Sequence, residues 1–315
     1  MSRPLVWASL AVVVLVGLSL VLGSYARYIL TMWMIFAIAT TGLNIPMGLS
    51  NLYSFGHGGF MLIGAYVTGI GVANWGLPFW AAMALSIVCA AFVGALVGLP
   101  SLRLTGFSLG IVTFALGMVL FQTVKAFEYT GGPQGVFLPG VEQSAWLGGR
   151  FFYYLALALL VLGQLAAFSI ASSKTGRALR TLGSSEIVAT SLGVHLLRYK
   201  VLAFVLSAVY GAVAGSLLAL TTGYVAPETY SPELSVELFA AVMIGGSGTQ
   251  VGPLLGALFT VLIPEVTQGA RGMGQILYAL LFCVIATLFP AGLAGMIQAA
   301  WRTAAAGRRE KVGRA

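Results

Sequence analysis

The sequence predicts an all-α membrane protein with about ten membrane-spanning segments, within a range of about eight to ten. Three observations lead to this fold class. Of the 315 residues, 59% are hydrophobic and only 8% are charged. The mean hydropathy is +0.98, which is far above that of soluble globular domains. The net charge of +8 is concentrated in a polar stretch at 172–200 and in a basic tail at 302–315.

Apolar runs of roughly 20 residues are long enough to cross about 30 Å of hydrocarbon as helices. Such runs occur at 5–23, 28–48, 55–73, 78–100, 106–124, 151–171, 201–222, 234–247, 252–268 and 274–298. Two of them, 55–73 and 234–247, are short and flanked by glycine, so they are candidates for re-entrant or broken helices. The run at 5–23 follows Arg3 and lacks a clear cleavage site, which favours an uncleaved first span over a signal peptide.

The charges predict the orientation of the chain. The stretch at 172–200 carries six charged residues, whose burial at bilayer depth would cost on the order of 15 kcal/mol, so we expect all of them to lie in water. They are Lys174, Arg177, Arg180, Glu186, Arg198 and Lys200. Because short loops rich in Lys and Arg stay in the cytoplasm, both termini are expected there, and the segment 125–150 is expected in the periplasm. Arg27 and Arg271 are exceptions on the outer side. The transmembrane region then covers 1–301 and the tail 302–315.

A short helix is predicted from Glu186 to Leu192 within the polar stretch. Ser184 or Ser185 can cap its start, Glu186 suits the positive end of the helix dipole, and Gly193 can end the helix in a left-handed turn. Ile187, Val188 and Leu192 give this helix an apolar side that could lie on the membrane surface or enter a groove of a partner protein. A plain solvated loop is the alternative.

Small residues recur with helical spacing, which lets helices approach closely in lipid, so we expect them to serve helix packing. One set is Ala203, Ser207, Gly211, Gly215 and Ala219, and the other is Gly248, Gly252 and Gly256. The glycine-rich stretches at 54–66 and 245–258 lie at similar places in the two halves of the chain and hint at an internal duplication.

The sequence shows no motif of an ATPase, of a metal cluster or of a Ser, His and acid hydrolase. It contains no Asp, only two His, and no phosphate-binding loop, so no ATPase site and no metal cluster is expected. Cys89 and Cys283 lie in apolar runs and are read as small hydrophobic residues. For His57, a histidine satisfied in a turn is the simpler interpretation, and the alternative is a channel-lining broken helix, where the flanking glycines would free backbone groups to contact a zwitterionic solute. The pathway candidates are Asn44, Ser54, His57, Gly58 and Gly59.

Five segments together resemble the LivM-type permease subunits of branched-chain amino acid ABC importers. They are GLNIPMGLSNLYSFGHGGFMLIGAY at 42–66, LRLTGFSLGIVTFALG at 102–117, TGGPQGV at 130–136, GRALRTLGSSEIVATSLGVHLLRYKVLAFVLSAVYGAVAG at 176–215, and the stretch from GYVAPETYSPELSVELFAAVMIGGSGTQVGPLLGAL at 223–258 to PE at 264–265. The resemblance implies that Glu186, Ala189 and Gly193 belong to a coupling helix that contacts a cytoplasmic ATPase. One difference is that Gly183, Ser184 and Ser185 replace the acidic residues common before that glutamate.

The resemblance also implies the partners of the chain. These are a second, LivH-type permease chain, two cytoplasmic ATPase subunits that hold ATP and Mg, and a periplasmic or tethered solute-binding protein that selects the substrate. The chain itself would then be a transporter subunit of the bacterial inner membrane, with no cofactor of its own.

Three other functions remain open from the sequence. Urea-system permease subunits share much of this pattern, so a urea or amide importer is the first. A carrier driven by protons through Glu237 or Glu265 is the second, since ionisable residues at membrane depth are often functional. A membrane anchor that transports nothing is the third.

Overall fold

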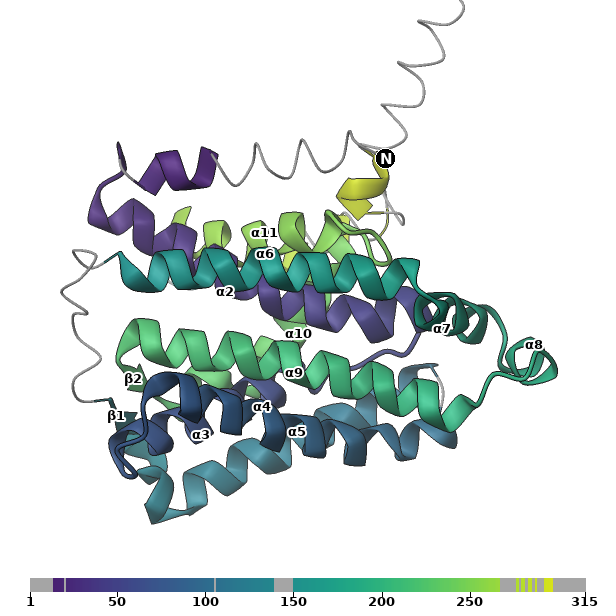
Figure 1. Ribbon diagram of the computed structural model, residues 1–315, viewed down its shortest axis with the longest axis horizontal. Coiled ribbons are helices and arrows are strands. Elements are labelled where there is room, and N and C mark those ends of the chain that lie inside the picture. Colours follow the sequence, from purple (N-terminus) through teal and green to yellow (C-terminus); the bar gives the residue numbers. More distant parts are fainter. Residues whose placement is uncertain are drawn as a thin grey trace, which may run out of the picture.

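The protein is a bundle of helices with two very short strands at one end (Figure 1). The computed structural model describes residues 14–19, 21–104, 106–138 and 150–266, with short stretches between 276 and 296. The helices are α2 (Ser24–Asn44), α3 (His57–Ala73), α4 (Phe79–Gly98), α5 (Gly106–Ala126), α6 (Phe151–Ser172), α7 (Lys174–Ser184), α8 (Glu186–Ser191), α9 (Leu196–Thr222), α10 (Pro232–Gly245) and α11 (Gly252–Val266). The shorter elements are the π-helix η1 (Ile45–Leu49), the 3-10 helices η2 (Pro100–Leu102), η3 (Glu128–Thr130), η4 (Gly132–Gln134) and η6 (Pro227–Tyr230), and the strands β1 (Val136–Phe137) and β2 (Tyr224–Val225).

The all-α membrane architecture agrees with the prediction. Among the described residues, 5 helical segments are long and apolar enough to cross a membrane: α2 with η1, α4, α5, α6 and α9. Helices α3, α10 and α11 have only 17, 14 and 15 residues. The predicted run at 274–298 lies mostly, and the tail at 302–315 entirely, outside the described residues, as do residues 5–13 of the predicted first span.

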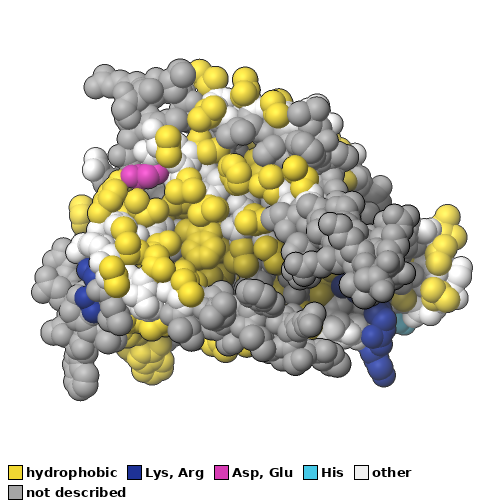
Figure 2. All heavy atoms as spheres, turned by 90° about the horizontal axis from the view of Figure 1, so that it is seen from above, with side chains coloured by type: hydrophobic (Ala, Val, Ile, Leu, Met, Phe, Trp, Pro, Cys, Tyr) yellow, Lys and Arg dark blue, Asp and Glu magenta, His cyan; other side chains and the backbone are white. Residues whose placement is uncertain are grey.

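The outer surface is apolar where a membrane would surround it. Large hydrophobic side chains point outward from several helices, including Phe92 of α4, Phe107 and Ile111 of α5, and Leu162 and Phe168 of α6. Figure 2 shows one face on which hydrophobic side chains cover the middle, while Lys and Arg lie towards its two ends. This distribution suits contact with lipid or with another membrane subunit.

Helix α9 is the centre of the bundle and packs against α2, α3 and α4. The predicted small-residue set on α9 is buried throughout, from Ala203 to Ala219. A Cβ atom on Gly215 would lie 1.9 Å from the Met61 carbonyl oxygen of α3, so only glycine permits this approach. Lipid offers no hydrophobic drive between helices, and close backbone contact therefore holds them together.

The second predicted set is only partly helical. Gly252 and Gly256 lie in α11, and Gly256 faces the backbone of Ala241 in α10. Gly248 differs from the prediction because it lies in the turn between α10 and α11, with a positive φ of 76°. Its N–H donates to Asn44 Oδ1 at 2.8 Å, and Asn44 Nδ2 donates to the Thr249 carbonyl at 2.9 Å. Asn44 therefore joins the end of α2 to this turn.

The chain breaks out of the α-helix directly after Asn44. Pro46 has no N–H to donate, and residues 45–49 form a π-helical turn. The Ser50 hydroxyl and the Leu52 N–H donate to the Pro46 carbonyl, which satisfies this buried group. A non-helical segment then leads to the start of α3 at His57.

A clasp joins two connections at the end of the bundle opposite α8 (Figure 1). We use this name for residues 125–138 and 223–230. β1 pairs antiparallel with β2, with Val136 opposite Val225. Lys125 Nζ lies 3.1 Å from a carboxylate oxygen of Glu228. The pKa of Glu228 is lowered by a hydrogen bond from its own backbone and then by Lys125.

The packing of α9 yields a first prediction. Gly215→Ala should destabilise the chain by about 1 to 3 kcal/mol, because the new Cβ meets backbone atoms that cannot move separately. The measurement is thermal unfolding of the purified chain in detergent. Gly23→Ala is the matched control, since no atom lies within 4 Å of a Cβ at that position. Equal melting temperatures for the two variants would contradict the packing role of Gly215.

The clasp yields a second prediction. A carboxylate whose pKa is lowered in the folded state stabilises that state above its ordinary pKa, here 4.5, and loses this effect as the pH falls through the lowered value. Glu228→Gln should therefore speed hydrogen exchange of the Leu138 N–H, which donates to the Gly223 carbonyl, by up to about fivefold at neutral pH, as expected for an exposed ion pair. As the pH falls through the lowered pKa of Glu228, the difference in exchange rate between the variant and the native chain should disappear. A difference that grows on acidification would refute the ion-pair account.

Candidate functional site

The candidate site is the α7–α8 hairpin, which projects from one end of the bundle (Figure 1). Helix α7 was not predicted, and it forms the first part of the polar stretch at 172–200. The Ser173 hydroxyl caps it by accepting from the Gly176 N–H, and Gly176, Leu179 and Leu182 are buried at spacings of three residues. Lys174, Arg177 and Arg180 are exposed, as predicted. The Ser cap and this spacing are the signals that could have revealed the helix.

Helix α8 is present where a short helix was predicted, and it ends one residue earlier, at Ser191. The Ser185 hydroxyl accepts from the Val188 N–H at 3.4 Å. Gly193 has a φ of 77°, the left-handed conformation that commonly follows a helix. Both ends of the helix therefore form in the way that the sequence predicts.

The two sides of α8 face different surroundings. Ile187, Val188 and Leu192 are 81%, 50% and 69% exposed, so three large apolar side chains point away from the chain. Ala189 is fully buried, and Glu186 turns inward. A solvent-facing apolar surface of this kind is typical of a site that binds another protein.

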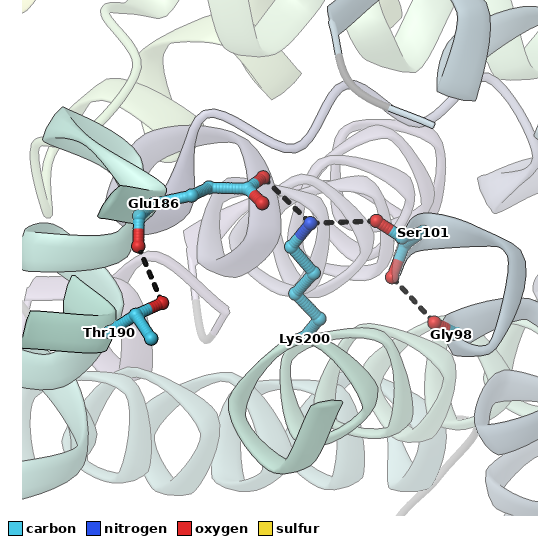
Figure 3. A network of polar contacts seen from close by, with 5 residues as sticks. All are labelled: Gly98, Ser101, Glu186, Thr190 and Lys200. Atoms are coloured by element: carbon cyan, nitrogen blue, oxygen red, sulfur yellow. Dashed lines mark hydrogen bonds and ion pairs between the residues drawn. The ribbon is translucent and has the colours of Figure 1, made fainter. Parts of the chain in front are cut away.

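Lys200 overturns the expectation that every charge of the polar stretch lies in water. Its side chain is 0% exposed, in the second turn of α9. The ammonium lies 2.7 Å from Glu186 Oε1 and donates at 2.7 Å to the Ser101 carbonyl (Figure 3). The prediction counted each charge as unpaired, whereas an ion pair with a further hydrogen bond offsets the cost of burial. Arg198, two residues earlier, is exposed.

Gly183 explains why no acidic residue is found at this point of the hairpin. A Cβ atom at Gly183 would lie 2.9 Å from the Leu49 carbonyl oxygen and from two backbone atoms of Ser50. Asn51 Nδ2 also donates to the Gly183 carbonyl at 2.9 Å. The end of α7 therefore packs directly on the segment that follows the π-helical turn, and a larger residue does not fit there.

The pathway candidates lie apart from this hairpin, and most of them are inside the chain. Ser54, His57, Gly58 and Gly59 are buried, while Asn44 is partly exposed. His57 Nδ1 is 3.1 Å from the Ser207 hydroxyl of α9, and the Gly58 N–H donates to the Ser235 hydroxyl of α10 at 2.9 Å. Sequence reasoning missed Ser235. The group thus connects α3 to α9 and α10.

The two glutamates considered for a proton-driven carrier, Glu237 and Glu265, are both only partly buried. Glu265 accepts a hydrogen bond from the hydroxyl of Tyr25, which lies in the first turn of α2. Among the described residues, no three His, Cys, Asp or Glu side chains gather as a metal site would require.

The sequence of this chain is similar to those of known membrane transport proteins. Residues 25–289 match the family described as branched-chain amino acid transport system / permease component. The LivM permease protein of the high-affinity branched-chain amino acid transport system is 32% identical in Salmonella typhimurium and 33% identical in Escherichia coli, over 85% of this chain and 69% of the relative. The LivH permease protein of Escherichia coli is 26% identical, over 82% of this chain and 91% of that protein. No solved structure shows a significant match.

The family match covers most of the chain and includes α2 to α11. The LivM likeness covers the same region at a level of identity that indicates common descent. The chain therefore belongs to the family of permease components of branched-chain amino acid transport systems, and it is a transporter subunit rather than an enzyme.

Proposed function

We propose that this chain forms half of the translocation pathway of an ATP-driven importer for branched-chain or chemically related amino acids. Its partners would be a second, LivH-type permease chain, two ATPase subunits and a solute-binding protein. The observation that carries the coupling proposal is the exposed apolar side of α8 at one end of the bundle. ATP and Mg would be held by the ATPase subunits, because this chain has neither a phosphate loop nor any Asp.

The two ends of the bundle would have different partners in the bacterial inner membrane. The α7–α8 hairpin carries exposed Lys174, Arg177 and Arg180, which favours the cytoplasmic side and contact with the ATPases. The clasp lies at the opposite end and would receive the loaded binding protein in the periplasm. The N-terminus would then be cytoplasmic, and an even number of spans would place the C-terminus there too.

Transport would require α3 to separate from α9 and α10. The pathway candidates near His57 are buried in those contacts, so a solute reaches them only when the helices move apart. Serine hydroxyls, a histidine and the glycine backbone offer hydrogen bonds to a zwitterion and add no net charge. Substrate choice would rest mainly on the binding protein.

The function is tested by reconstituting the chain in proteoliposomes with its second permease chain, ATPases and binding protein. Uptake of radiolabelled leucine, isoleucine or valine that requires ATP and the binding protein is the expected result. The same binding protein is screened with urea and acetamide. Uptake of urea alone would overturn the amino acid proposal, and uptake by the isolated chain along a pH gradient would overturn the ATP-driven mechanism.

The docking role of α8 gives a third prediction. Ile187→Asp should weaken binding of the ATPase by about 10- to 100-fold, because burial of an isoleucine contributes about 1.5 to 3 kcal/mol. Folding should be unaffected, since Ile187 is 81% exposed. Affinity is measured by titrating the ATPase onto the permease pair in nanodiscs, with Ile187→Leu as the control. Equal affinity for the Asp and Leu variants would exclude this surface as the docking site.

The pathway proposal gives a fourth prediction. His57→Ala should lower the rate of leucine uptake by about tenfold or more while the complex still assembles, because a group that the solute contacts during passage is lost. Ser86→Ala is the control, because it removes a similarly buried interhelical hydrogen bond, to Ser216 of α9, outside the candidate group. Equal rates of leucine uptake in the His57→Ala and Ser86→Ala variants would indicate that His57 has only a structural role.

A further inference from the structure

Lys200 is the one Lys, Arg or Glu side chain that is fully buried within the described residues. A buried ammonium is strongly destabilising unless an opposite charge and hydrogen-bond acceptors surround it. Two groups do so here, the Glu186 carboxylate of α8 and the Ser101 carbonyl of η2, each at 2.7 Å. Figure 3 shows the ammonium between them. Helices α8 and α9 and the η2 segment, about a hundred residues earlier in the chain, therefore meet at one atom.

Helix α8 makes few polar contacts of its own with the rest of the bundle. The hydroxyls of Ser185, Thr190 and Ser191 bond only to backbone groups of α8 itself. In the part of the chain that the structure describes, Glu186 thus makes the only side-chain polar contact from α8 to a membrane helix. The covalent connection from Leu192 to His195 is mostly exposed and contains the left-handed Gly193, so it is a poor element for transmitting a push.

Helix α9 can carry a displacement far into the bundle. It runs for 27 residues, and Lys200 lies near its start. Seven residues further along, Ser207 contacts His57 of α3. The Ser101 carbonyl adds the connection between α4 and α5 to the same point. A movement of the ammonium would therefore act on α9, on α3 and on the α4–α5 connection.

We infer that the ion pair between Glu186 and Lys200 transmits the movement of α8, driven by the ATPases, to α9 and to the α4–α5 connection. Lys200 is thus a positioning residue for coupling, and it acts through Glu186. This inference rests on the proposed function. It assigns the outer side of α8 to docking and the inner side to transmission.

The test compares Glu186→Gln, Lys200→Met and the double variant in the complete reconstituted complex. The double variant removes both members of the pair and leaves no buried charge unpaired, a replacement that stability usually tolerates. Three quantities are measured: binding of the ATPase, basal ATP hydrolysis, and leucine transported per ATP. Arg103→Met is the matched control, because it removes an exposed cation two residues from Ser101.

The double variant should bind the ATPase and hydrolyse ATP at the basal rate, while leucine transported per ATP falls at least about tenfold. Each single variant should lower the leucine transported per ATP at least as much as the double variant does. The loss in the double variant should therefore not exceed that of either single variant, as expected for two residues that act through one contact. An unchanged ratio in the double variant, or losses that simply multiply, would overturn the inference. A native complex that shows no ATP-dependent uptake would instead refute the proposed function.

Discussion

The structure depends on the close approach of α9 to its neighbours. In lipid, two helices gain no hydrophobic stabilisation when they bury apolar surface against each other, so they are held together by many close contacts between their backbones. Those contacts need small residues, and α9 supplies them from Ala203 to Ala219. Because α9 is packed along its length against α2, α3 and α4, any displacement of α9 acts on its contacts with all three helices. The α7–α8 hairpin precedes α9 in the chain and β2 of the clasp follows it, so α9 connects the two ends of the molecule.

The two ends differ in the strength of their polar connections. At the clasp, Lys125 is partly exposed and Glu228 is exposed, so water screens their ion pair and it contributes little to stability. At the hairpin, the ammonium of Lys200 is enclosed, and its separation from Glu186 would leave a charge in a medium that cannot solvate it. The ion pair of the hairpin is therefore costlier to break than that of the clasp.

Sequence reasoning located most helices because apolar length and composition decide which segments enter a membrane. The short lengths of α3 and α10 were also predictable from the glycines that flank them. The π-helical turn at 45–49 and the strand pair β1–β2 were not, since two-residue strands and local changes of helix type depend on neighbours that are distant in sequence. Segment length alone cannot decide how many helices cross fully.

At the candidate site, the ends of α8 could be predicted because caps are local features of sequence. The burial of Lys200 could not, because its partners Glu186 and Ser101 come from other segments. Likewise, the need for glycine at position 183 follows from its packing against the backbone of Ser50, which the sequence does not reveal. Helix caps could therefore be predicted from neighbouring residues, whereas contacts between residues far apart in the sequence could not.

The division of α8 into two sides has a consequence for how such importers diversify. Ile187, Val188 and Leu192 face outward, whereas Glu186 and Ala189 face the bundle. Under the docking that we propose for α8, a lineage could exchange one ATPase for another by altering these three outward side chains, while the contact between Glu186 and Lys200 is kept.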